Sequence, residues 1–239
     1  LASRRIGSAT FDHGAQFITA RTPRFAALLS EWKELGLVAE WYRGTNKEHI
    51  YWRGVPSMTA VPKHLSKSLN VRLEMKMAVL KQEGSHWLAI FENGETITAN
   101  AVLLTAPVPQ SLALLDAGGV ALEASMREQL EAVEYEPCMA VMAVLNGKSN
   151  IPQPGFVRPE SGPVAWIADN QAKGISAISA VTIHATPAFS LEHQDDDRQK
   201  VGQYLLEVAA PWLGSETAEF QIHAWRYARP RHEQDHPCL

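Results

Sequence analysis

The sequence predicts a mixed α/β protein in which a few helices accompany short, mostly antiparallel strands. Three observations carry this prediction. Apolar residues recur at helical spacing between Thr22 and Gly36. Asn93-Gly94, a dipeptide typical of tight hairpins, separates two segments of alternating character. The second half contains several short apolar segments divided by turn residues, and the 239 residues, 46% of them hydrophobic, are enough to bury a substantial core.

Two helices are expected in the first 70 residues. Thr22-Pro23 predicts an N-cap followed by proline in the first turn, and Gly36 predicts the helix end. A second helix is expected over 60–69, where Pro62 is tolerated because the first turn does not need its N–H.

From residue 71 the pattern changes to that of strands. We expect strands over 71–80, 87–91 and 95–99. The apolar run 101–106 stops at Pro107 and predicts a strand buried on both faces, as in a parallel sheet.

The remainder predicts two helices and four strands. Helices are expected over 125–133 and 196–210, and Asp195-Asp196-Asp197 would place negative charge at the start of the second. A metal site at this acidic run is the weaker interpretation, because no second cluster of oxygen ligands lies nearby. The expected strands are 138–145, 164–168, 177–184 and 220–227.

Composition excludes several function classes. The net charge is −4 and no basic stripe stands out, so nucleic acid and anionic membranes are not expected partners. No apolar run reaches the length of a membrane span. Cys138 and Cys238 lie a hundred positions apart, which argues against a disulfide framework and favours a reducing, cytoplasmic setting. His232, His236 and Cys238 lack a convincing fourth ligand, so no metal is expected.

The segment Phe11-Asp12-His13-Gly14-Ala15-Gln16-Phe17 carries the densest candidate chemistry. It combines a carboxylate, an imidazole, a carboxamide and a glycine between two aromatic rings. Such a set suits close approach to a planar ligand with polar edges. An ordinary loop in which Asp12 caps a turn explains the same residues equally well.

Two later strand ends offer further candidates. His184 ends an apolar strand and could donate to a ligand, or its ring could simply bond to the backbone. Trp225 and Tyr227 must point to one face of a strand and Arg226 to the other. The two rings could form a wall for a flat substrate, or an aromatic pair in the core.

The chain resembles the renalase-like branch of the flavin-containing amine oxidase superfamily. The resemblance extends in family order over almost the whole chain. Its carrying segments are Ala2-Ser3-Arg4-Arg5, residues 11–17, Pro56-Ser57-Met58, residues 102–110, Tyr135-Glu136-Pro137-Cys138 and Trp225-Arg226-Tyr227-Ala228.

The resemblance implies an FAD-dependent oxidoreductase with a glutathione-reductase-like fold. In such a protein, hydride passes from a small substrate to the flavin and oxygen reoxidises it to give hydrogen peroxide. The family suggests isomeric dihydronicotinamides as substrates. The alternatives are an amine oxidase of the same superfamily and a cofactor-free module that binds a substrate or partner.

The resemblance also implies roles for particular residues. Trp225 and Tyr227, with His184, would face the isoalloxazine ring across the substrate cavity and are the candidate catalytic groups. Phe17 and Phe189 stand where the family usually has Tyr and Trp, which weakens polar contacts there. The implied FAD-binding residues are Arg4, Arg5, Asp12, His13, Gly14, Ala15, Gln16, Met77, Ala106 and Pro107.

The family's glycine-rich phosphate-binding turn and its later Gly-Asp motif are not in this sequence. The resemblance therefore implies an internal fragment that is inactive and cannot hold FAD by itself. Segments 1–20 and 70–115 would be remnants of the FAD-binding domain. Segments 21–69 and 116–229 would form the substrate-binding domain, and 230–239 a loose end.

Overall fold

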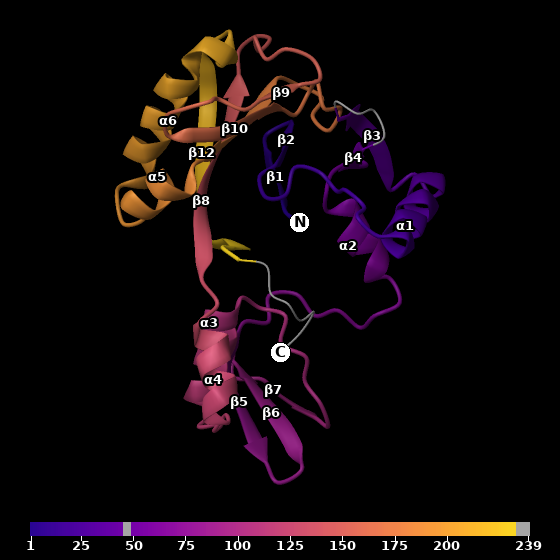
Figure 1. Cartoon of the computed structure of the whole chain (residues 1–239), viewed down its shortest axis with the longest axis vertical. Helices are drawn as coiled ribbons and strands as arrows, with labels where there is room; N and C mark the ends of the chain where they lie inside the picture. Colours follow the sequence, from indigo (N-terminus) through magenta and orange to yellow (C-terminus); the bar gives the residue numbers. More distant parts are fainter. Residues whose placement is uncertain (45–48, 233–239) are drawn as a thin grey trace. The chain divides into compact units, whose positions relative to one another are not determined.

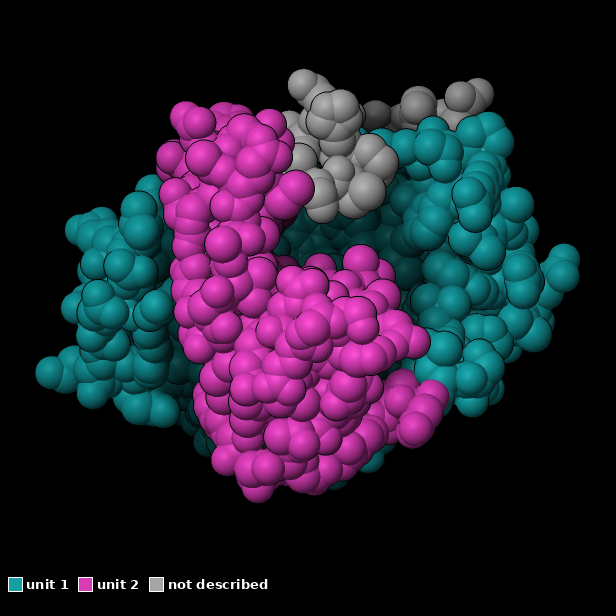
Figure 2. Space-filling model, turned by 90° about the horizontal axis from the view of Figure 1, so that it is seen from below, with its two compact units in different colours: residues 1–69, 137–228 teal, residues 70–136, 229–239 magenta. Residues whose placement is uncertain are grey.

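The computed structural model describes residues 1–44 and 49–232. The chain forms two compact units, which Figure 2 colours separately. Unit 1 contains residues 1–69 and 137–228, and unit 2 contains residues 70–136 with the segment that begins at Arg229. Residues 1–20 therefore share a unit with 21–69. Compactness does not assign cofactor or substrate roles, so the predicted functional division of the chain stays a prediction.

A five-stranded sheet forms the centre of unit 1 (Figure 1). Its strand order is β12-β8-β11-β10-β9, and the pairings of β8 with β11, β11 with β10 and β10 with β9 are antiparallel. This confirms the predicted mixed class with mostly antiparallel strands. The strands are β8 (Tyr135–Leu145), β9 (Phe156–Val157), β10 (Val164–Asp169), β11 (Ala180–Ala185) and β12 (Thr217–Pro230).

Two helices cover one face of this sheet, α5 (Pro187–Glu192) and α6 (Arg198–Leu213). Alternate residues of β8 and β11, such as Val141 and Ile183, pack against α6 in the largest apolar cluster. Helix α6 begins as predicted at the acidic run, because the Asp197 side chain accepts a hydrogen bond from the backbone N–H of Lys200.

A hairpin of β1 (Ser3–Ile6) and β2 (Ala9–Asp12) packs against the opposite face of the sheet. Its apolar side chains meet Met142 and Ala180, which belong to the alternate set of β8 and β11 residues. The sheet is thus covered by helices on one side and by this hairpin on the other. The loop that follows β2 also faces the sheet on the hairpin side, because Thr182 of β11 donates to the backbone carbonyl of Asp12.

The rest of unit 1 lies between residues 18 and 69. Helix α1 (Pro23–Glu34) confirms the prediction, including its Thr22 cap, and buries Leu29 and Trp32. Helix α2 (Ala60–Leu65) ends four residues earlier than predicted. Strands β3 (Val38–Arg43) and β4 (Ile50–Gly54) pair as a hairpin that the sequence did not predict.

Unit 2 is a three-stranded meander packed against helix α3. Its elements are β5 (Met77–Glu83), β6 (His86–Phe91), β7 (Thr96–Ala99), α3 (Val108–Ala117) and α4 (Ala124–Glu131). Strand β5 begins six residues later than predicted. Glu74 has a φ of 59°, which interrupts the extended backbone before Met77.

The predicted buried strand over 101–106 is wrong. This segment has no regular structure, and Leu103 is 86% exposed. Only Leu104 packs against the core of unit 2. A run of apolar residues becomes a buried strand only when neighbouring strands cover its faces and pair its edges, and the described part of the chain supplies none here.

Among the described helices, none combines the length and apolar character needed to cross a membrane.

Candidate functional site

Asp12 is the centre of a buried polar network. Its side chain is fully buried, and one carboxylate oxygen lies 2.9 Å from the Nζ of Lys173, which is also fully buried. The other oxygen accepts from Ser3 Oγ at 2.7 Å and from the backbone N–H of Met58 at 3.0 Å. The carboxylate thus joins three segments of unit 1. Its engagement by protein groups accounts for its burial, and direct contact with a cofactor stays a prediction.

Backbone and side-chain bonds fix the loop after Asp12. The carbonyl oxygen of Asp12 accepts from Thr182 Oγ1 and from Gln16 Nε2. Gln16 Nε2 also donates to the carbonyl of Gly14, so the amide nitrogen donates to two carbonyl oxygens. The amide oxygen, Gln16 Oε1, is buried and has no hydrogen-bond partner among the described residues. It is an acceptor left available for a donor from outside this part of the chain.

The carbonyl of His13 brings the predicted residues of two distant strands together. It accepts from His184 Nε2 at 3.1 Å and from Trp225 Nε1 at 2.9 Å. The Trp225 ring also approaches the loop closely, because a Cβ on Gly14 would lie 3.6 Å from its Cζ2 atom. His13, Gly14, His184 and Trp225 therefore form one site, although up to 212 positions separate them in the chain.

The hydrogen bonds define the protonation of two imidazoles. A carbonyl only accepts, so His184 carries its proton on Nε2, and His13, whose Nδ1 lies 3.2 Å from the Ala2 carbonyl, carries its proton on Nδ1. Burial lowers the pKa of His184 to about 4. Burial, with the charge of Arg4, also lowers the pKa of His13. Both rings are therefore neutral near pH 7, leaving one lone pair on each.

His223 is a member of this site that was not predicted. Its ring centroid lies 4.3 Å from that of Trp225 and 5.3 Å from that of His13. Burial and the Arg4 charge lower its pKa as well. The alternation of a strand places residues 223, 225 and 227 on one face, while Phe220 and Ile222 pack into the core on the helix side. Applied two residues further back, that alternation could have identified His223.

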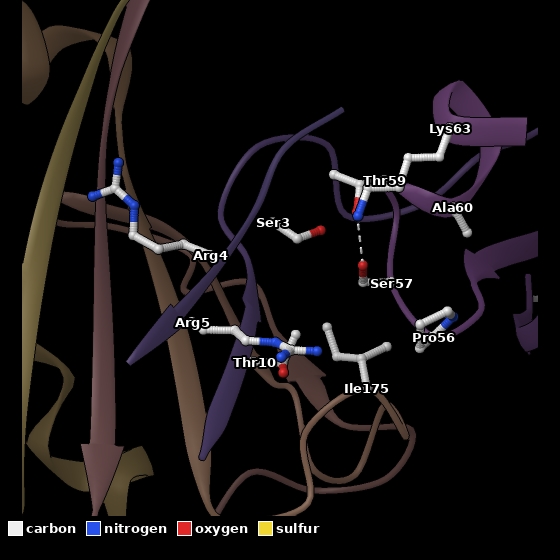
Figure 3. A pocket seen from close by; sticks show the side chains of 10 residues that line it. All are labelled: Ser3, Arg4, Arg5, Thr10, Pro56, Ser57, Thr59, Ala60, Lys63 and Ile175. Carbon is white, nitrogen blue, oxygen red and sulfur yellow. Dashed lines mark hydrogen bonds between the residues drawn. The ribbon is translucent and has the colours of Figure 1, made fainter. Parts of the chain in front are cut away.

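A cavity of about 360 Å³ lies beside the β1–β2 hairpin (Figure 3). Three cationic and four hydroxyl side chains line it, and no carboxylate does. None of the three cations has an ion pair with any residue that the structure describes. The lining residues are Ser3, Arg4, Arg5, Thr10, Pro56, Ser57, Thr59, Ala60, Lys63 and Ile175.

The other predicted site residues lie outside this hydrogen-bonded network or border it. Ala15 is exposed beside the loop, and Tyr227 is half-buried on the same face of β12 as Trp225. Met77, Ala106 and Pro107 belong to unit 2, where Met77 packs against the core. Their predicted contacts with FAD stay predictions.

Phe17 joins an aromatic cluster on the hairpin side of the five-stranded sheet. Its ring approaches Tyr51 at 4.9 Å and Trp166 at 6.0 Å. Phe189, the other departure from the family pattern, is buried on the helix side of the sheet and contributes to the core. A polar contact from position 189 would therefore lie on the face opposite to the loop of residues 12–16.

The described residues contain no group of three or more His, Cys, Asp or Glu side chains that could hold a metal ion. Two of the three terminal candidates weighed above, His236 and Cys238, lie outside the described residues.

Solved structures with a similar fold include several oxidases and a fatty acid isomerase, although no family model matches the sequence. A protein from Exiguobacterium sp. 255-15 with the provisional name protoporphyrinogen oxidase matches 80% of this chain at 19% identity and a TM-score of 0.54. Cyclohexylamine oxidase from Brevibacterium oxydans matches 76% at 11% identity and a TM-score of 0.55. A putrescine oxidase mutant matches 73% at 14% identity and a TM-score of 0.55.

The likeness is one of fold. This chain spans only 40–42% of the length of those three proteins. It has the fold of a part of such oxidases, and the activity of the whole protein is a matter of proposal.

Proposed function

We propose that these 239 residues form the substrate-binding part of an FAD-dependent oxidoreductase. The observation that carries the proposal is the convergence of the loop 12–16 with His184 and Trp225 beside a cavity lined by cations. The similarity in fold to oxidases supports it. The substrate that we propose is an isomer of a dihydronicotinamide.

The cavity has the chemistry of a site for a phosphate-bearing group. Arg5 and Lys63 supply positive charge, and the hydroxyls of Thr10, Ser57 and Thr59 supply donors. Without a carboxylate in the lining, nothing there neutralises these cations except solvent or a bound anion. The residues therefore fit the phosphate-bearing tail of FAD.

The loop next to the cavity fits the other end of such a cofactor. Gln16 Oε1 is a buried acceptor with no partner in the described chain, and a ring with an N–H at its edge would satisfy it. When bound, FAD would supply the redox chemistry, taking a hydride from the substrate and passing two electrons to oxygen, which leaves as hydrogen peroxide.

The chain's own groups would orient the substrate and exclude water. Trp225 is fixed by its bond to the His13 carbonyl, so its indole ring offers a rigid, half-buried surface to a flat ligand. His184 stays neutral near pH 7 and holds its proton on Nε2 toward His13. A dihydropyridine already holds a transferable hydride, so no proton acceptor is required of these residues.

An amine oxidase of the same superfamily is the second candidate. It is favoured by the names of two structures with a similar fold, which are oxidases of cyclohexylamine and of putrescine. The two candidates differ in substrate charge and can be separated by reduction of the flavin without oxygen. A dihydronicotinamide isomer should bleach the flavin absorbance and a primary amine should not.

The test uses the gene product that carries these residues, isolated at its natural length. We expect a yellow protein with about one FAD per chain. Replacing both Arg5 and Lys63 by Gln should weaken FAD affinity about tenfold, because two charge-assisted contacts with phosphate are lost. Lys67→Gln, which changes a cation four residues after Lys63 in the turn that follows α2 and outside the cavity lining, is the matched control.

Two outcomes count against the proposal. A colourless protein that takes up no added FAD would remove the enzyme interpretation and leave the cofactor-free binding module. A flavoprotein whose FAD affinity ignores the double replacement would show that the cavity does not hold the phosphates.

A further inference from the structure

Neighbouring arginines of β1 point to opposite sides of the hairpin. The register pairs Arg5 with Thr10, and both residues line the cavity together with Ser3. Arg4 pairs with Phe11 and lies two residues before Ile6, so all three side chains share one face of the hairpin. The side chains of Ile6 and Phe11 pack onto the sheet. In Figure 3 the Arg4 guanidinium accordingly points away from Ser57 and Thr59, whereas Arg5 extends toward Thr10 and Ile175.

The charge of Arg4 acts on the face of β12 that carries His223, Trp225 and Tyr227, which we call the ring wall. The Arg4 side chain points to the side of the hairpin away from Ser57 and Thr59 (Figure 3), and its charge is one of the causes that lower the pKa values of both His13 and His223. Arg4 is half-buried, and its guanidinium makes no ion pair or hydrogen bond with any other described residue. A partly buried cation without a counterion favours a ligand that brings negative charge.

The ring wall presents two half-buried rings, those of His223 and Trp225. The ring planes of these two residues lie at 69° to each other. The nearby imidazoles of His13 and His223 stay uncharged near pH 7, because burial lowers both pKa values. The positive charge at this wall therefore comes from Arg4.

We propose that Arg4 is a specificity-determining residue that makes the ring wall select flat ring compounds bearing a negative charge and reject ammonium ions. The inference rests on the proposed function only in taking the ring wall as the substrate side. It deepens that function, because a dinucleotide carries phosphates and an alkylamine carries a positive charge. Arg5 then serves the cofactor cavity, whereas Arg4, which also borders that cavity, directs its guanidinium away from it and serves substrate selection.

Three probes of one ring size and different charge test this on the 239-residue chain itself. Benzoate, benzamide and benzylammonium are titrated while the indole N–H resonance of Trp225 is followed by NMR, the resonance being identified with Trp225→Phe. We expect benzoate to bind about fivefold more tightly than benzamide, the order of a partly exposed charge pair, and benzylammonium to bind most weakly. Salt at about 0.5 M should remove most of the difference.

Variants locate the charge. Arg4→Gln should bring benzoate binding to the level of benzamide, whereas Arg4→Lys and Arg5→Gln should keep the preference. If Arg4→Gln does not fold, the Arg4→Lys and Arg5→Gln results and the salt dependence of the unaltered chain still decide the matter. Equal binding of the three probes, no shift with any of them, or loss of the preference in Arg5→Gln would overturn the inference.

The outcome is separable from that of the FAD experiment. A protein that binds FAD but shows no charge preference would lose this inference and keep the proposed function. A protein that shows the charge preference but never binds FAD would keep this inference and lose the proposed function.

Discussion

Unit 1 buries an ion pair at one loop, whereas the ion pairs of the meander in unit 2 lie at the surface. Asp12 and Lys173 have fully buried side chains and lie 161 positions apart in the sequence. In unit 2, Lys76 pairs with Glu92 while 76% and 54% of the two side chains remain exposed. The candidate chemistry lies where the buried network is, which indicates that desolvated polar groups at long sequence separation identify the site better than exposed ion pairs do.

The largest expected effect comes from breaking the buried pair. Lys173→Met removes the ammonium and leaves the Asp12 carboxylate buried without its cation, which should lower the free energy of unfolding by about 3–5 kcal/mol. Urea unfolding followed by circular dichroism measures it. Adding Asp12→Asn should restore part of the loss, because the uncompensated charge is gone. A loss below about 1 kcal/mol would contradict the description of Lys173 and Asp12 as a fully buried pair.

A smaller effect concerns His184 and pH. The pKa of His184 in the folded chain is about 4, below the ordinary value of 6.5. Between these two pH values the unfolded chain therefore binds a proton at this residue and the folded chain does not. Stability should therefore fall as the pH drops from about 6.5 toward 4, with about 2 kcal/mol lost between pH 7 and 5 from this group. His184→Gln should remove that part of the pH dependence. Parallel unfolding curves for the variant and the unaltered protein at both pH values measure the difference.

The smallest effect is expected in unit 2. Lys76→Gln removes one partner of an exposed pair that solvent already screens, so the free energy of unfolding should change by no more than about 0.5 kcal/mol. The same urea experiment applies. A loss comparable to that of Lys173→Met would remove the contrast between the two units.

Elements with strong local signals were predictable from the sequence. Helix α1 follows from the Thr22 cap and its apolar spacing, and the β6–β7 hairpin follows from Asn93-Gly94. The β1–β2 hairpin was missed although Gly7, with a φ of 55°, marks its turn. The error over 101–106 arose because an apolar run looks the same whether or not neighbouring strands exist to cover it.

The site was predictable only in part. Its loop, His184 and Trp225 were candidates from their residue types, the family resemblance added their roles, and the structure brings them together at the His13 carbonyl. Their contact with a flavin stays a prediction. Lys173 could not be predicted, because nothing local links an isolated lysine to a carboxylate 161 positions earlier. The division of labour between Arg4 and Arg5 needed the register of β1 with β2.

The wide spacing of these partners has a consequence for synthesis. Residue 12 leaves the ribosome long before its partners Asn170, Lys173 and Thr182. The carbonyl of His13 can bond to Trp225 only after a further 212 residues have been synthesised. At bacterial or eukaryotic elongation speeds that delay is roughly 10–40 s. During this interval the nascent hairpin exposes apolar side chains and a carboxylate without its lysine partner. We therefore expect chaperones to bind the nascent chain until β12 emerges.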